Sequence, residues 1–142
     1  MKKKSLSAKK KIHNNLLNYL KNPIIGKIYK DFENLLILDN KVKNLSIAVS
    51  GGPDSLALTY LGKCFSILNN LKVNYYHLDH KLRKNSTKEA LKLKSILKKF
   101  DIDCKILVWK GKKPKSNIQS LARKKRYFLM INQILKDKSN HL

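Results

Sequence analysis

The stretch "LSIAVSGGPDSLALTYL", residues 45–61, decides the fold of this chain. It opens with an apolar run that ends at Val49, crosses a short polar turn, and resumes an apolar pattern after Ser55. Such a run is typical of a buried strand, and Pro53 stands where proline is favoured, in the first turn of a helix. The stretch therefore predicts a strand, a glycine turn and a helix over residues 53–68.

The same alternation continues on the C-terminal side of this stretch. Strand-like apolar runs alternate with segments of helical spacing, and each strand is nearly all apolar, which is typical of an open parallel sheet with right-handed crossovers. The predicted fold class is therefore α/β, a Rossmann-like open parallel sheet with helices on both faces, preceded by N-terminal helices. The further strands are expected at 73–79 and 104–109, and the further helices at 86–100, starting with a Ser86–Glu89 capping box, and at 118–135.

The length of 142 residues favours one folded domain with an N-terminal extension. We expect residues 1–29 to form a basic tail and a helix, with the tail solvated over 1–11. Two helices are expected within 12–38, separated around Asn22–Pro23 and Gly26. The domain that carries the sheet is expected to span residues 30–142.

The chain has a formal net charge of +23, from 32 Lys and Arg against 9 Asp and Glu. Such an excess favours a polyanionic partner, nucleic acid above all, although a compositional bias toward lysine also produces it. Arginine offers a planar bidentate donor to phosphate that lysine lacks. The three arginines, Arg83, Arg123 and Arg126, are therefore the informative basic positions.

Cysteine spacing and hydropathy limit the cellular locations in which the chain is expected. Cys64 and Cys104 form neither a zinc-binding spacing nor a C-x-x-C pair, so we interpret them as reduced, buried thiols. The sequence has no apolar stretch long enough to span a bilayer, so no membrane partner is expected and the predicted location is cytoplasmic. Trp109 and Phe128 are expected in the core, whereas Tyr127 is expected to pack or to stack on a base.

The turn after the first strand combines features of a phosphate site. Gly51 and Gly52 allow positive φ and close approach of a ligand, and Ser50 and Ser55 add hydroxyls. Successive N–H groups followed by a helix N-terminus form an anion nest, which suits phosphate or pyrophosphate. Asp54 fits if it holds Mg²⁺ or orients the turn. The alternative is that these residues only turn the chain and cap a helix.

Three segments resemble the tRNA(Ile)-lysidine synthetases of the PP-loop, or N-type ATP pyrophosphatase, superfamily. Residues 50–55 resemble the SGGxDS signature, "HLDHKLRKNSTKEA" (77–90) resembles a D-H-x-L-R segment followed by Ser and Glu, and "IQSLARKKRYFLM" (118–130) resembles I-Q-x-x-A-R-x-x-R-Y. The resemblance implies an ATP site at Ser50, Gly51, Gly52, Pro53, Asp54, Ser55, Asp79 and His80. It also implies catalytic roles for Asp54 and Arg123, Mg²⁺ at Asp54, and RNA contacts at Arg83, Arg123 and Arg126.

The implied reaction joins free lysine to the wobble cytidine of an isoleucine tRNA with a CAU anticodon. ATP first adenylates the cytosine 2-carbonyl with release of pyrophosphate, and the lysine amine then displaces AMP. Members of the family continue into another strand and a His-x-x-Asp-Asp-type segment, so we expect this chain, ending at His141–Leu142, to be C-terminally incomplete. A separate polypeptide or domain would then carry the remainder.

Two other functions stay open at the sequence level. The first is another PP-loop enzyme that modifies tRNA, such as a thiolation enzyme, although these often carry C-x-x-C pairs. The second is a non-catalytic, basic nucleic-acid-binding fragment that retains the loop.

Overall fold

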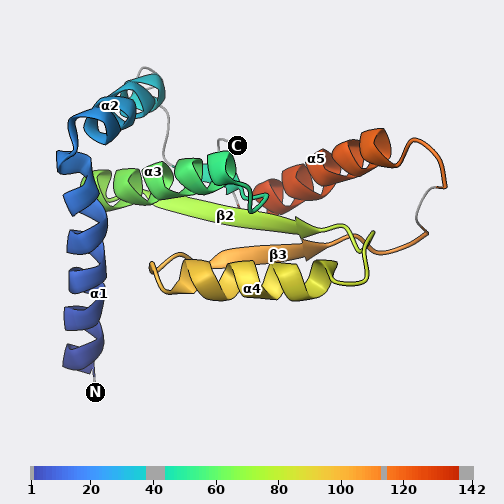
Figure 1. Ribbon diagram of the computed structural model, residues 1–142, viewed down its shortest axis with the longest axis horizontal. Helices are drawn as coiled ribbons and strands as arrows, with labels where there is room; N and C mark the ends of the chain where they lie inside the picture. Colours follow the sequence, from blue (N-terminus) through green and yellow to red (C-terminus); the bar gives the residue numbers. More distant parts are fainter. Residues whose placement is uncertain (1, 38–43, 113–114, 138–142) are drawn as a thin grey trace.

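The computed structural model describes residues 2–37, 44–112 and 115–137, and side chains from Leu6 onward. Within these residues the chain forms three strands and five α-helices with one short 3-10 turn (Figure 1). In chain order they are α1 (Lys2–Asn18), η1 (Tyr19–Lys21), α2 (Pro23–Ile37), β1 (Asn44–Ala48), α3 (Pro53–Asn69), β2 (Lys72–Asp79), α4 (Ser86–Lys98), β3 (Cys104–Val108) and α5 (Ile118–Lys136).

The three strands form one parallel sheet in the order β1-β2-β3. The register sets Ile47 of β1 opposite Tyr75 of β2, and Tyr75 opposite Cys104 of β3. Because all three strands run in the same direction, their carboxyl ends share one edge of the sheet. The predicted alternation of strands and helices is confirmed, with every strand within about a residue of its expected position.

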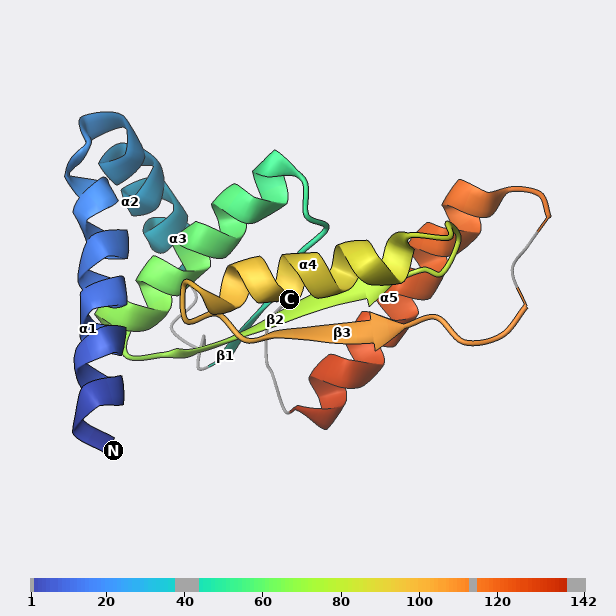
Figure 2. The ribbon, with the colours of Figure 1, turned by 60° about the horizontal axis from the view of Figure 1, so that its bottom comes forward.

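Helices cover both faces of the sheet, as the sequence predicted (Figures 1 and 2). Side chains of α3 and α4 pack on one face, in a cluster with Leu45, Ile47, Val49, Tyr75, Leu97, Ile102 and Cys104. Met130 and Ile134 of α5 pack on the other face, against Tyr76 and Leu78. Residues alternate between the faces along β2, so Tyr75 and Tyr76 point into different layers.

The N-terminal helices pack at the end of the sheet opposite the carboxyl ends of the strands (Figures 1 and 2). Tyr29 of α2 is buried with Cys64 and Phe65 of α3 in a third apolar cluster. Helix α1 adds the buried Leu16, whose carbonyl oxygen accepts a hydrogen bond from the Tyr60 hydroxyl at 3.0 Å. These contacts join the N-terminal helices to the sheet layers through α3.

Four local predictions need correction. The segment expected as a solvated tail belongs to α1, which begins at Lys2, although its described side chains from 6 to 10 are exposed. The break expected at Gly26 is wrong, because Gly26 lies inside α2. The break expected at Asn22–Pro23 is confirmed, and the Asn22 side chain accepts hydrogen bonds there from the Ile24 and Ile25 amides at 3.0 and 3.3 Å. Proline at the start of α2 fixes this boundary, because it tolerates the first helical turn but not the interior.

The other two corrections concern α4 and the aromatic residues. Ser86 and Glu89 form no capping box, because the N-cap residue is Asn85 and the Ser86 hydroxyl donates to Asp79 instead. Phe128 is 57% exposed, whereas Trp109 is buried as predicted. Both cysteines are free and buried, also as predicted. Pro114 and the chain end at His141–Leu142 lie outside the described residues.

A cluster of charged groups around Asp101 holds α1 to the domain. The Asp101 carboxylate lies 2.8 Å from His13 Nε2, 3.0 Å from Lys63 Nζ and 3.4 Å from Lys9 Nζ. Lys63 also donates to the Asp101 carbonyl at 2.6 Å. Partial burial raises the pKa of this carboxyl, but the bonds to His13 and Lys63 outweigh burial and hold the pKa at about 2.

We expect Asp101→Asn to lower the free energy of unfolding by about 1–2 kcal/mol at pH 7, because it weakens the charge-assisted bonds to Lys63 and His13. Asparagine tolerates the left-handed backbone at this position, where φ is 57°, so the backbone should not change. The contribution is complete above the ordinary carboxyl pKa of about 4 and is lost as the pH falls toward about 2. Urea titration at pH 7 and pH 3 measures both effects.

Asp103→Asn is the matched control, because Asp103 is a nearby exposed carboxylate. It should change the stability by less than about 0.5 kcal/mol. Equal losses in the two variants would mean that the Asp101 cluster does not anchor α1.

Candidate functional site

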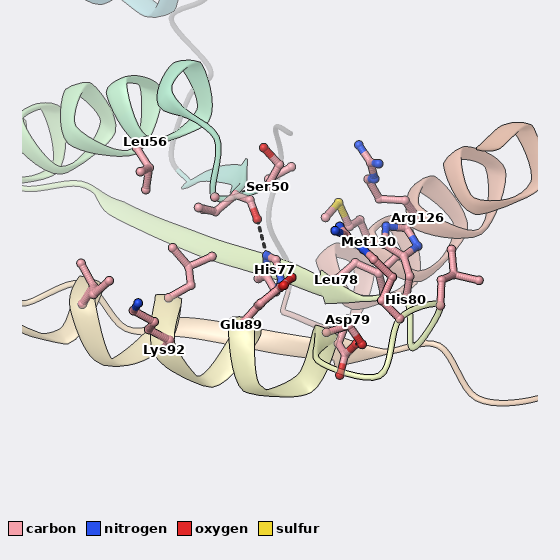
Figure 3. Close-up of a pocket in the computed structure, with 18 residues that line it drawn as sticks. Ser50, Leu56, His77, Leu78, Asp79, His80, Glu89, Lys92, Arg126 and Met130 are labelled. Atoms are coloured by element: carbon pink, nitrogen blue, oxygen red, sulfur yellow. Dashed lines mark hydrogen bonds between the residues drawn. The ribbon is translucent and has the colours of Figure 1, made fainter. Parts of the chain in front are cut away.

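A pocket of about 670 Å³ opens at the carboxyl ends of the strands, where ligands bind in open parallel sheets (Figure 3). Its walls come from β1 and the following loop, β2 and its continuation, and helices α3, α4 and α5. It combines an apolar wall at one end, formed by Leu56, Leu93 and Ile96, with polar and basic groups elsewhere. The polar and charged lining residues are Ser50, His77, Asp79, His80, Arg83, Ser86, Glu89, Lys92 and Arg126.

The loop between β1 and α3 gathers its hydrogen-bond donors around one oxygen. The amides of Ser50 and Gly51 donate to Ser55 Oγ at 3.2 and 3.1 Å, and Ser50 Oγ lies 2.9 Å from the same atom. The Ser55 hydroxyl in turn donates to the carbonyl of Gly52 at 3.0 Å. Convergent N–H groups next to a helix N-terminus produce a positive potential that favours a phosphate oxygen, and in this structure Ser55 Oγ takes the place of that oxygen on the Ser50 and Gly51 amides.

The two glycines of the loop have different backbone conformations. Gly51 adopts φ +93°, a region that side chains rarely occupy, so a residue other than glycine is strained here. Gly52 is the N-cap of α3 with φ −77° and ψ 165°, which any residue can adopt. A turn with positive φ was expected at both glycines, and the structure has it at Gly51 and not at Gly52.

The first turn of α3 supplies further donors and a carboxylate. The N–H groups of Asp54 and Ser55 lie in the first helical turn, where no preceding carbonyl of the helix reaches them. Asp54 is exposed, and the helix dipole stabilises a negative charge at this end. Gly52, Pro53, Asp54 and Ser55 do not line the pocket itself, which contacts the loop at Ser50 and Gly51.

Asp79 lines the pocket, but its carboxylate oxygens are occupied by the protein. Oδ1 accepts hydrogen bonds from the Lys81 amide at 2.9 Å and the Ser86 hydroxyl at 2.7 Å, and Oδ2 accepts from the Thr87 hydroxyl at 2.7 Å. Burial alone raises the pKa of Asp79, but the bonds from Thr87 and Ser86 outweigh it, so the pKa lies below its ordinary value. The carboxylate thus fixes the turn between β2 and α4.

His80 follows Asp79 and also lines the pocket. Its ring meets the buried Trp109 edge to face, with centroids 6.3 Å apart. The sequence-predicted pair at the end of β2 therefore does reach the pocket, with His80 packed beside β3 and Asp79 bonded into the adjoining turn.

The three arginines lie differently with respect to the pocket. Arg83, in the turn after β2, and Arg126, on α5, both line it. Arg123 is exposed one turn earlier on α5 and does not line it, and its guanidinium lies 5.9 Å from the centre of the Tyr127 ring. Tyr127 is half exposed, so the ring remains accessible beside a cation.

Residues that the sequence analysis missed also line the pocket. His77 of β2 has its ring Nδ1 2.7 Å from the carbonyl oxygen of Val49, the last residue before the loop. Glu89 and Lys92 line the pocket from α4, which lies across it from Ser50 and from Leu56 of α3 (Figure 3). Glu89 was expected as a helix cap and as part of the family-like segment 77–90, with no role in the pocket, and no sequence signal marked Lys92 among 32 basic residues.

Comparison with known proteins agrees with this geometry. The family model of the ATP-binding PP-loop domain matches residues 20–142. The chain belongs to the PP-loop family. The loop that follows β1 lies within the matched residues, and the pocket at its edge is the candidate nucleotide site.

Several curated relatives of the chain are named tRNA(Ile)-lysidine synthase. The protein of Rickettsia rickettsii strain Sheila Smith is 36% identical over 111 residues, which cover 76% of this chain and 23% of the relative. That of Bartonella henselae is 41% identical over 98 residues, 66% of this chain and 20% of the relative. That of Bradyrhizobium diazoefficiens is 32% identical over 100 residues, 69% of this chain and 28% of the relative. The chain therefore spans about a quarter of the length of these relatives.

Within the described ranges, no helix is both long enough and apolar enough to cross a bilayer. Nor do the described side chains form a group of three or more His, Cys, Asp or Glu with the arrangement of a metal site.

Proposed function

We propose that this chain binds ATP and takes part in the formation of lysidine, by adenylating the wobble cytidine of an isoleucine tRNA with a CAU anticodon. The observation that carries the proposal is the position of the pocket. It opens beside the donor-rich turn of Ser50 and Gly51, at the carboxyl edge of the sheet in a PP-loop domain. The names of the curated relatives support the choice of reaction within the family.

In this proposal the adenine base contacts the apolar wall and the phosphates meet the loop. The amides of Ser50 and Gly51 and the N-terminus of α3 would hold the pyrophosphate that leaves when the cytosine 2-carbonyl oxygen attacks the α-phosphate. The free lysine amine would then attack the activated carbon, and AMP would depart with the oxygen. The loop therefore stabilises charge that develops on the leaving group.

Asp54 is the proposed magnesium ligand, because it is an exposed carboxylate one helical turn from the loop amides. The ion would neutralise charge on the phosphates. Arg123 lies outside the pocket, so its proposed catalytic role requires that the bound tRNA bring the reacting cytidine next to it. We further propose that the protein acts in the cytoplasm, and that residues 30–142 are the ATP-binding unit, completed by a further polypeptide segment or domain.

The thiolation alternative finds little support in the cysteines. Cys64 and Cys104 are fully buried, and burial raises the pKa of the Cys104 thiol to about 11 and that of Cys64 above its usual value. A thiolate is the reactive form of cysteine, so neither residue is suited to carry sulfur.

Incorporation of labelled lysine into unmodified isoleucine tRNA tests the proposal, with and without a polypeptide that carries the segment expected downstream. ATP–pyrophosphate exchange in the presence of tRNA separates an enzyme from a non-catalytic nucleic-acid-binding fragment. We expect exchange and incorporation in the complemented reaction. Tight tRNA binding without nucleotide binding would favour the fragment alternative.

Substitutions of two arginines separate the residues that contribute to ATP binding from those that contribute to tRNA binding alone. Arg126→Lys, inside the pocket, should weaken both ATP and tRNA binding by about three- to tenfold, because lysine keeps the charge but loses the bidentate geometry. Arg123→Lys, one turn away on the exposed face of the same helix, should weaken tRNA binding alone. Calorimetry with ATP and filter binding with tRNA at constant salt measure the two effects, and equal ATP losses in both variants would contradict the assignment.

A further inference from the structure

The ring of His77 takes the place of a strand hydrogen bond at the point where the loop leaves the sheet. Its Nδ1 lies 2.7 Å from the Val49 carbonyl oxygen (Figure 3). A carbonyl oxygen only accepts hydrogen bonds, so Nδ1 carries the hydrogen and donates it. The ring is half-buried and lines the pocket, directly below the loop.

This contact ends the pairing of β1 with β2. The Val49 amide still donates to the carbonyl of Tyr76 at 2.8 Å, as in a continuing ladder. In a parallel ladder the Val49 carbonyl would next accept from the amide of Leu78. The register instead ends at Ala48 opposite Tyr76, and a side chain of β2 occupies that carbonyl. The chain can then turn away from the sheet at Ser50.

Because the peptide bond is planar, the contact with His77 also orients the first N–H group of the loop. The Val49 carbonyl and the Ser50 amide belong to one rigid unit and point in opposite directions. When His77 holds the carbonyl against β2, the Ser50 N–H is directed away from β2. It points to Ser55 Oγ at 3.2 Å, beside the Gly51 amide at 3.1 Å from the same atom.

We infer that His77 is a positioning residue of the phosphate loop, which sets the direction of the first N–H donor through the Val49–Ser50 peptide. The inference rests on the proposed function, because it takes the loop amides as phosphate ligands. His77 acts through the backbone and not by contact with the phosphates. A histidine that only fills the core would leave the loop amides unchanged when an apolar side chain replaces it.

Two substitutions distinguish these roles. Asparagine carries its side-chain N–H near the position of Nδ1, so His77→Asn retains a donor for the Val49 carbonyl, whereas His77→Leu removes it. Calorimetry with ATP and with inorganic pyrophosphate should show about a tenfold loss of affinity for both ligands in His77→Leu, and a loss of less than about threefold in His77→Asn. Both ligands should respond alike because the loop holds phosphates and not the base.

Amide hydrogen exchange measures how well the loop amides are held in the ligand-free chain. His77→Leu should speed the exchange of the Ser50 and Gly51 amides by about tenfold, and His77→Asn should leave it close to that of the unaltered chain. His13→Leu is the control, because His13 also bonds a partner, Asp101, at the far end of the sheet. That variant should leave both the exchange and the affinities unchanged.

The outcomes separate the inference from the proposed function. If the unaltered chain binds neither ATP nor pyrophosphate, the proposed function fails, while the exchange data still test the positioning role. The inference itself is overturned if His77→Leu leaves the exchange of Ser50 and Gly51 unchanged. It is equally overturned if asparagine fails to restore what leucine removes.

Discussion

Gly51→Ala is expected to weaken ATP binding about tenfold. The backbone at Gly51 has φ +93°, and an added Cβ would also lie 3.5 Å from Leu93 Cδ2 on the pocket wall. An ordinary residue in such a conformation costs about 1–2 kcal/mol, so the free loop relaxes and the cost returns when ATP restores the turn. Calorimetry with ATP and Mg²⁺ measures the effect, and a thermal melt measures the stability of the variant.

Gly111→Ala is the matched control for backbone strain. Gly111 follows β3 with φ +102°, nothing lies within 4 Å of an added Cβ, and the residue does not line the pocket. The variant should lose similar stability and keep its ATP affinity. Gly52→Ala provides the second comparison, because its φ is ordinary and its Cβ would meet only Ser50 Oγ at 3.7 Å. Equal affinities for ATP in Gly51→Ala and Gly111→Ala would remove Gly51 from the site.

Most of the fold was predictable because the strands lie between two layers of helices. A strand in that position is mainly apolar, as in residues 45–49, where Ser46 is the one polar residue, and the glycine pair marks where that segment ends. The helices followed from their spacing. The first half of helix α1 was the exception, since the lysines at 2–4 and 9–11 interrupt any apolar stripe. The position of α1 depends on Asp101, which is 88 residues from His13.

The part of the candidate site formed by one short motif was predictable. The part formed by residues that come together only in the folded chain was less predictable. The loop residues are contiguous, so their types alone indicate an anion site. His77 and Glu89 belong to the family-like segment 77–90, but they reach the pocket because β2 and α4 meet there, which the local sequence does not show. Phe128 was placed in the core from its residue type alone, but Met130 and Ile134 form the face of α5 that meets the sheet.

Asp79→Ala is expected to be the most destabilising substitution, with a loss of about 3–5 kcal/mol in the free energy of unfolding. The carboxylate is buried and accepts hydrogen bonds from the Lys81 amide and the hydroxyls of Ser86 and Thr87. Alanine would leave these donors without an acceptor at the turn where β2 passes into α4. Asp79→Asn should cost only about 1–2 kcal/mol, because one oxygen remains and hydroxyls can rotate to accept. Urea titration monitored by circular dichroism gives both values.

Asp54→Ala separates this structural role from the proposed binding role of a neighbouring carboxylate. Asp54 is exposed, so its loss should change stability by less than about 0.5 kcal/mol, while weakening the magnesium-dependent binding of ATP. Asp79→Asn should show the reverse, with reduced stability and nearly normal ATP affinity at a temperature where it is folded. The pKa of Asp79 is lowered in the folded state. Its contribution to the free energy of unfolding is therefore present above the ordinary carboxyl pKa, and it is lost as the pH falls through the pKa of the folded state. An Asp79→Ala variant as stable as the unaltered chain would show that the turn holds without its carboxylate, and Asp79 would then be free to serve the nucleotide directly.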